Sequence, residues 1–241
     1  MAESQQVIKT ETLKRLLKDV RQIIKHPLTD NGIYYSHDDN DLTKGYAMII
    51  GPSNTPYFGG YYFFKFNFPV DYPFSPPNVT YMTNDGFTRY NPNLYKCGKV
   101  CVSILNTWNG DKWSSCQTIN SVLLTLCSLL NETPFENEPG QSKTSIDYIP
   151  YQNSIEFKNI DFCICQLLLK HTIIPDPFQI FYPFMKEHFI NNCDKYLKFV
   201  QSKTDKQSIQ IVRLYNMTTH VNYNDLEHKL ITTKQIVDND T

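Results

Sequence analysis

The sequence has no excess of charge of either sign. Its 23 lysines and arginines nearly balance 24 aspartates and glutamates, which leaves a formal net charge of −1 over 241 residues. Proteins that bind nucleic acid or anionic membranes by general electrostatic attraction carry a strong positive charge. The composition therefore predicts neither a nucleic-acid partner nor a membrane partner.

Long hydrophobic runs are also missing. The longest apolar stretch, Val122 to Leu130, is interrupted by Thr125 and Ser128, and it is far shorter than the roughly 20 residues of a membrane-spanning helix. The first ten residues, MAESQQVIKT, have no apolar core of a signal peptide. We therefore expect a cytoplasmic protein, with entry into the nucleus left open, whose seven cysteines are reduced.

Neither an internal repeat nor a phosphate-binding loop is present, so we expect no bound cofactor or nucleotide. What is present is the composition of a folded chain. Hydrophobic residues make up 41% and charged residues 20% of the sequence, which is enough to bury a core. The length fits one good-sized domain with an extension, or two small domains.

Hydrophobic periodicity predicts an α+β fold. Apolar residues recur at helical spacing from Leu13 to Ile24 and indicate an amphipathic N-terminal helix. Its opposite face carries a basic stripe of Lys14, Lys18, Arg21 and Lys25. Four short β-rich runs follow between turn residues, and they predict a four-stranded antiparallel meander packed on that helix. The runs are Ile33 to Ser36, Tyr46 to Ile50, Tyr61 to Phe68, and Val79 to Met82.

The third run alternates strictly and predicts a half-buried strand. Tyr62, Phe64, Phe66 and Phe68 lie on one face, and Lys65 and Asn67 lie on the other. Residues 84–115 show no sustained periodicity, and long irregular loops of this kind tend to be functional. Thr118 to Leu130 then predicts a buried central helix. Further C-terminal helices are expected over Ile155 to Leu169, Pro183 to Val200, and Asn224 to Ile236.

The irregular loop resembles the active-site stretch of ubiquitin-conjugating enzymes, in which a His-Pro-Asn tripeptide precedes the catalytic cysteine. Here Asn93 lies eight residues before Cys101, as in that family. The segment Tyr72 to Pro77 is similar to the family's proline-rich turn, and Trp113-Ser114 is similar to its Trp-Ser pair before the central helix. The likeness implies a conjugating core over residues 9–170 with the ubiquitin-conjugating fold. It also implies a C-terminal helical extension over residues 171–241, as in the larger members.

This resemblance implies that Cys101 accepts ubiquitin or a ubiquitin-like modifier from an activating enzyme as a thioester. The modifier then passes to a lysine of a substrate or to a ligase. A thiol can take an acyl group from another thioester by nearly isoenergetic exchange, and the product stays reactive toward amines. Because the thiolate is the attacking species, partial exposure of Cys101 on its loop would help. ATP would be used upstream by the activating enzyme.

The resemblance gives further residues in the loop a role. Asn93 would donate a hydrogen bond to the oxyanion or hold the loop in shape, although asparagine beside proline is also an ordinary turn residue. Asn91 stands where the family has its histidine, which puts the internal hydrogen bonding of the loop in question. Asn137 or Glu138 would flank the acceptor lysine, and a turn-capping role fits them equally well.

Partner surfaces follow from the same likeness. The basic stripe corresponds to the face that meets the activating enzyme, and a solvated helix face is the alternative. The stripe residues expected at that interface are Lys14, Lys18 and Arg21. Phe74 and Ser115 correspond to ligase-docking positions, but Ser114-Ser115-Cys116 replaces the family's usual Ser-Pro-Ala. The expected partners are the modifier, the activating enzyme, a ligase and protein substrates, with the chain itself a monomer.

Other interpretations of the cysteines remain open. A cysteine hydrolase needs a histidine base beside the thiol, and no histidine lies between His37 and His171, so only long-range pairing would supply one. A zinc site from Cys97, Cys101 and Cys116 has spacings that match no common pattern, so we expect no metal. A non-catalytic family variant that acts as a binding scaffold would lack the cysteine, which this chain keeps.

Overall fold

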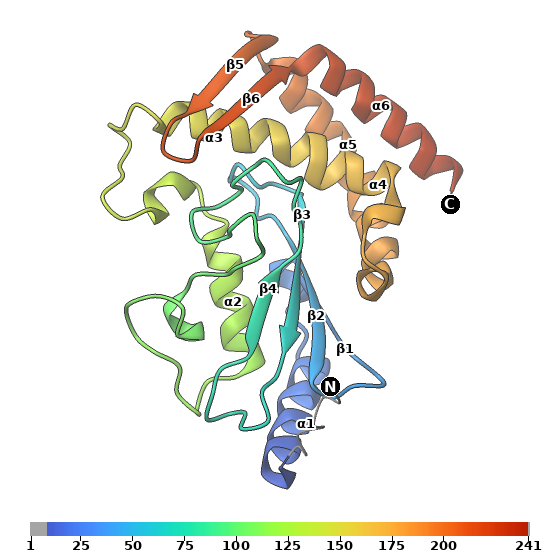
Figure 1. Ribbon diagram of the computed structural model, residues 1–241. Helices are drawn as coiled ribbons and strands as arrows, with labels where there is room; N and C mark the ends of the chain where they lie inside the picture. The colour runs from blue at the N-terminus through green and yellow to red at the C-terminus, as the bar shows by residue number, and fades with distance from the viewer. Residues whose placement is uncertain (1–8, 241) are drawn as a thin grey trace, which may run out of the picture.

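The computed structural model describes residues 9–240. The expectation that no signal peptide is present concerns the first ten residues, most of which lie outside this range. Within this range helix α1 (Thr10–Lys25) comes first, and four strands follow in the order β1-β2-β3-β4, each antiparallel to its neighbour. The strands are β1 (Ile33–His37), β2 (Lys44–Ile50), β3 (Tyr61–Asn67) and β4 (Asn78–Tyr81). The predicted meander is therefore confirmed (Figure 1).

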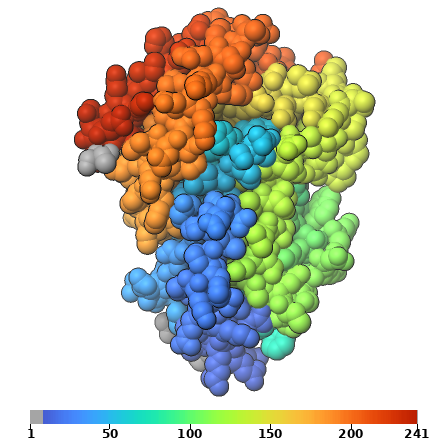
Figure 2. Space-filling model, turned by 180° about the vertical axis from the view of Figure 1, so that it is seen from behind, coloured from blue at the N-terminus to red at the C-terminus, as the bar shows by residue number. Residues whose placement is uncertain are grey.

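Two helices cover one face of this sheet. Helix α1 buries Leu16, Val20 and Ile23, whereas Ile24, which the periodicity placed on the apolar face, is 72% exposed. Helix α2 (Ile119–Leu129) is the predicted central helix, and its buried side chains are Ile119, Val122, Leu123 and Leu126. Seen from behind in Figure 2, the blue N-terminal helix lies against the yellow-green segment that contains α2.

The other face of the sheet is covered as well. Tyr61 and Phe63 on β3 are 0% and 1% exposed, and they belong to a second apolar cluster together with residues of the C-terminal region. The prediction of a half-buried strand is therefore wrong for the first half of β3, because the C-terminal region packs on the face that was expected to meet solvent. Lys65 and Asn67 remain partly exposed.

The C-terminal region is not purely helical. It contains α3 (Tyr148–Lys158), a π-helical stretch (Asn159–Gln166), α4 (Leu167–Leu169), α5 (Tyr182–Ser202), strands β5 (Gln207–Val212) and β6 (Met217–Asn222), and α6 (Tyr223–Asn239). The expected helices over 155–169, 183–200 and 224–236 are present, although the first begins at Tyr148. The β5–β6 hairpin was not predicted. Its inward-facing side chains include the polar residues Ser208, Gln210 and Thr219, so the sequence does not alternate between apolar and polar residues as a half-buried strand would.

The hairpin runs beside α3, and α5 and α6 pack against each other at the far end of the molecule from α1 (Figure 1). None of the helices in residues 9–240 is both long and apolar enough to cross a membrane. The boundary between core and extension at residue 170 stays a prediction. Two hairpin residues, Val212 and Met217, join the core cluster that contains α1 and α2.

Candidate active site

The turn before Cys101 is fastened to the end of the central helix by Asn91. This side chain is fully buried. Its amide nitrogen donates to the carbonyl of Leu129 at 2.7 Å and to the hydroxyl of Tyr57 at 2.9 Å, and its oxygen accepts from the backbone N–H of Asn93 at 2.9 Å. Leu129 ends α2, where backbone carbonyls lack partners inside the helix. The asparagine that stands in place of the family's histidine is therefore fully hydrogen-bonded.

Asn93 and Cys101 meet in space. The Asn93 side-chain amide donates to the carbonyl of Cys101 at 2.7 Å, and the Cys101 N–H donates to the carbonyl of Asn93 at 2.9 Å. Two hydrogen bonds thus bring together two residues that lie eight positions apart in the sequence. The side-chain oxygen of Asn93 is buried and has no partner within residues 9–240. An unsatisfied buried acceptor of this kind is unfavourable by about 1–3 kcal/mol until a donor reaches it.

Cys101 is covered by the residues that follow it. Its side chain belongs to a residue only 3% exposed, and the thiol donates to the carbonyl of Thr107 at 3.1 Å. The Thr107 hydroxyl holds this cover in place, because it donates to the carbonyl of Val100 at 2.8 Å and accepts from the N–H of Val102 at 3.0 Å. The expected partial exposure of Cys101 is therefore wrong for this conformation.

The two residues expected near the acceptor lysine are held differently. Asn137 donates to the same Leu129 carbonyl at 3.1 Å and accepts from the amide of Asn131 at 2.8 Å, so it lies beside the turn that carries Asn91. Glu138 accepts a 2.7 Å hydrogen bond from the hydroxyl of Tyr215, in the β5–β6 turn. Sequence reasoning did not single out Tyr215. No local pattern signals a contact between residues so far apart in the chain.

The expected partner surfaces are accessible. Lys14, Lys18 and Arg21 are exposed on α1, and none of them forms an ion pair in the described part of the chain. Phe74 is 73% exposed, and Ser115 is also exposed. Arg15, which the sequence analysis did not select, pairs with Asp19 at 3.0 Å and donates to the carbonyl of Ser115 at 2.5 Å. Arg15 therefore connects α1 to the loop that contains Ser115, the second residue expected at the ligase-docking surface.

The alternative chemistries find no support in the geometry. Among the hydrogen bonds of residues 9–240, none connects Cys101 to a histidine, as a hydrolase would require. No three His, Cys, Asp or Glu side chains in that range are grouped as the ligands of a metal ion would be, and this includes Cys97, Cys101 and Cys116.

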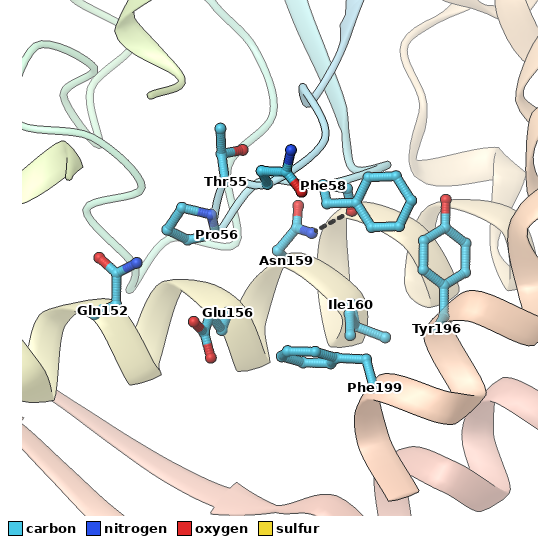
Figure 3. Close-up of a pocket in the computed structure, with 10 residues that line it drawn as sticks. Thr55, Pro56, Phe58, Gln152, Glu156, Asn159, Ile160, Tyr196 and Phe199 are labelled. Atoms are coloured by element: carbon cyan, nitrogen blue, oxygen red, sulfur yellow. Dashed lines mark hydrogen bonds between the residues drawn. The ribbon is translucent and has the colours of Figure 1, made fainter. Parts of the chain in front are cut away.

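A separate pocket of about 280 Å³ lies between the β2–β3 connection, α3 and α5 (Figure 3). Asn159 lines this pocket. Its amide donates to the carbonyl of Phe58 at 3.0 Å, and its oxygen accepts from the hydroxyl of Tyr62 at 2.6 Å. Glu156 on its wall pairs with Lys203 at 2.6 Å. None of the residues selected for the chemistry lines this pocket. It marks a junction between the core and the extension, away from Cys101.

The chain is similar to known proteins over the region that contains these features. Residues 15–160 match the family model described as "Ubiquitin-conjugating enzyme". The chain is 40% identical over 185 residues to "Ubiquitin-conjugating enzyme E2 Z" of Xenopus tropicalis, which covers 76% of this chain and 58% of the relative. It is 39% identical over 189 residues to the Homo sapiens protein of the same name, covering 77% and 52%.

A more distant relative is also similar. "Probable ubiquitin-conjugating enzyme protein 17" of Caenorhabditis elegans is 32% identical over 208 residues, covering 81% of this chain and 28% of the relative. The similarity to all three relatives reaches beyond the length matched by the family model. The chain spans little more than half the length of the Xenopus and human relatives.

Proposed function

This chain belongs to the ubiquitin-conjugating enzyme family, and we propose that it carries ubiquitin or a ubiquitin-like modifier on Cys101. In the first step the Cys101 thiolate attacks the thioester carbonyl carbon between the modifier and the cysteine of an activating enzyme, whose thiolate leaves. In the second step the nitrogen of an acceptor amine attacks the new thioester. Cys101 leaves as a thiolate and the amine loses one proton, so an amide bond replaces the thioester.

The observation that carries this proposal is the pair of hydrogen bonds between Asn93 and Cys101. These bonds hold the backbone of Cys101 next to the side-chain amide of Asn93. That amide has two hydrogens, of which the bond to the Cys101 carbonyl uses one, so the other can be donated to a second acceptor. A donor already in place next to the reacting carbonyl stabilises the developing oxyanion without reorganisation. The same bonds serve the loop-holding role, and the two roles are compatible in one side chain.

Loading of Cys101 requires the cover to open. Residues 106–109 are exposed, and Trp108 is 45% exposed. The segment is held by the Thr107 contacts and by the N–H groups of Asn106 and Thr107, which donate to the carbonyls of Ser103 and Val102. We propose that docking of the activating enzyme displaces this segment and that the basic residues Lys14, Lys18 and Arg21 on α1 contribute to that docking. Asn137, beside the active-site turn, would then flank the acceptor amine.

The remaining partners follow from the family. A ligase would dock at Phe74 and Ser115, and protein substrates would supply the acceptor lysine. ATP would be consumed by the activating enzyme, with no cofactor on this chain. All seven cysteines are free thiols, which fits a reducing compartment, and we propose the cytoplasm as the place of action.

A charging assay tests the proposal. The chain is mixed with modifier, ATP and each of a panel of activating enzymes, and the products are separated with and without reductant. The wild type should give a reductant-sensitive adduct, Cys101→Ala should give none, and Cys101→Ser should give an adduct that resists reductant because it is an oxyester. Cys97→Ala is the matched control and should charge normally. Absence of an adduct with every activating enzyme, or an adduct that survives Cys101→Ala, would contradict the proposal.

A further inference from the structure

The turn of the β5–β6 hairpin is docked into the conjugating core. Its N–H at Leu214 donates to the carboxylate of Asp147 at 2.8 Å, and the flanking residues Val212 and Met217 are 0% and 4% exposed within the core cluster. Figure 1 shows the hairpin running beside α3. The turn therefore has a defined position relative to the core, even though it belongs to the C-terminal extension.

Tyr215 at this turn makes two kinds of contact. Its hydroxyl donates to Glu138 at 2.7 Å, and its ring packs edge-on against Phe135 and at a tilt against Tyr151, with centroid distances of 6.2 and 5.6 Å. Burial, and then the hydrogen bond to Glu138, raise the pKa of the Tyr215 phenol, so it remains a neutral donor at physiological pH.

Arg89 connects Tyr215 to the active-site turn. Its guanidinium lies 3.3 Å from the ring centroid of Tyr95 and 5.5 Å from that of Tyr215. The same guanidinium donates to the carbonyl of Asn91 at 3.1 Å and to the carbonyl of Pro92 at 2.6 Å. These carbonyls immediately precede Asn93. A continuous chain of contacts thus runs from the extension through Arg89 to the amide that holds Cys101.

We infer that Tyr215 is a positioning residue for amine attack, which it supports by fixing Arg89 and, through it, the turn that carries Asn93. The inference rests on the function proposed above. A planar guanidinium held at an aromatic face can fix two carbonyls at once. Glu138 then anchors the Tyr215 hydroxyl and keeps the ring in place. The extension is by this account part of the active-site framework.

The test separates loading from transfer. Wild type and variants are charged on Cys101, activating enzyme is quenched, and discharge to free lysine is followed on non-reducing gels. Tyr215→Ala should charge at the wild-type rate and discharge roughly tenfold more slowly, an effect in the range seen for positions that couple to a site through contacts. Tyr215→Phe keeps the ring against Arg89 and should discharge within about twofold of wild type.

Variants of Arg89 provide a second test of the inference. Arg89→Lys keeps the charge but loses the planar fork, so it should slow discharge as much as Tyr215→Ala does. The double variant should be no slower than either single variant, because both changes break the same path. If Tyr215→Ala does not fold, Arg89→Lys decides alone. Thr218→Ala, an exposed residue of the same hairpin, is the matched control and should behave as wild type.

Specific outcomes overturn the inference. Wild-type discharge by Tyr215→Ala, or by Arg89→Lys where the former does not fold, removes the proposed role. Multiplicative losses in the double variant show two independent paths. Equal slowing by Tyr215→Phe places the effect at Glu138 instead of Arg89. Failure of the wild type itself to charge contradicts the proposed function and is recognised before any variant is compared.

Discussion

The side-chain amide of Asn91 donates a hydrogen bond of 2.7 Å to the carbonyl oxygen of Leu129, the last residue of α2. Asn137 donates to the same oxygen at 3.1 Å. One carbonyl at the end of the central helix therefore ties together the turn before Cys101 and the segment that follows the helix. The end of α2 therefore positions the irregular turn that carries Asn91 and the short 3-10 helix Pro134–Asn137 relative to each other.

Removal of the Asn91 side chain should destabilise the fold. Asn91→Ala breaks three buried hydrogen bonds and leaves the Asn93 N–H without its acceptor, so we expect a loss of about 2 kcal/mol in the free energy of unfolding. Asn137→Ala should lose less than about 1 kcal/mol, since Asn137 is partly exposed and Leu129 keeps its bond to Asn91. Urea unfolding measures both. A larger loss for Asn137→Ala than for Asn91→Ala would contradict this order.

Asn93→Ala should separate the two half-reactions. Both half-reactions pass through a tetrahedral oxyanion, but the thiolate exchange is nearly isoenergetic, whereas a neutral amine must attack and lose a proton. Amine attack therefore depends more on the donor, so the variant should charge normally and discharge to lysine about 10²-fold more slowly. Asn93→Asp has nearly the same shape but no amide hydrogens and should be equally slow. Single-turnover discharge provides the measurement. A normal discharge rate in either variant would reduce Asn93 to a turn residue.

Accessibility of the seven thiols should follow the structure. Cys97 and Cys116 are exposed, Cys101 is covered by Thr107, and Cys163 and Cys165 are buried. Brief alkylation followed by peptide mass spectrometry should therefore label Cys97 and Cys116 first. Thr107→Val keeps the side-chain shape but loses the hydroxyl bonds, and should speed labelling of Cys101 several-fold. Thr144→Val, an exposed threonine elsewhere, is the control. Equal Cys101 labelling in both variants would mean that Thr107 does not hold the cover.

Charge reversal on α1 should slow loading. Lys14→Glu combined with Lys18→Glu removes two exposed positive charges from the expected activating-enzyme face, and charging should slow roughly tenfold at low salt and less at high salt. The same reversal at Lys195 and Lys198, exposed on α5, is the matched control. Initial charging rates at two ionic strengths give the answer. If both pairs slow charging equally, only the net charge matters and the helix face has no special role.

The fold was largely predictable because its signals are local. Helical spacing predicted α1 and α2, and β-rich runs between turn residues predicted the four strands. Alternation in the third run predicted the face of β3 that carries Tyr62, Phe64 and Phe66. The second buried face at Tyr61 and Phe63 was not predictable, since their partners lie more than a hundred residues away; Tyr61, for example, donates to the carbonyl of Met185 at 2.7 Å. Local patterns do not reveal which face a later segment will cover.

The same limit applies to the site. The interval between Asn93 and Cys101 could be read from the chain, and the structure brings the two into contact. The burial of Cys101 could not be read from the chain, because it depends on how Thr107 folds back against the thiol. The role of Tyr215 could not be predicted either. Its contact with Glu138 spans 77 residues, and its hairpin has polar residues among the side chains that pack on α3.

Alkaline pH should destabilise the protein through its buried thiols and phenols. Burial raises the pKa of Cys165 to about 12, and burial also raises that of Tyr61 well above its usual value. The folded state therefore retains protons that the unfolded chain releases above about pH 8.5 for cysteine and pH 10 for tyrosine. Because the unfolded state then binds fewer protons, the free energy of unfolding falls as pH rises through this range, and the contribution is fully present below it.

Urea unfolding at several pH values between about pH 8 and pH 11 measures this slope. Cys165→Ala removes one of the groups that must stay protonated, so its free energy of unfolding should fall less steeply with pH than that of the wild type, whatever its stability at neutral pH. Cys97→Ala, at an exposed thiol, should keep the wild-type slope. A slope unchanged by Cys165→Ala would show that this thiol does not remain protonated in the folded state, and that the alkaline loss arises from the buried tyrosines and from other cysteines whose pKa burial raises, such as Cys163.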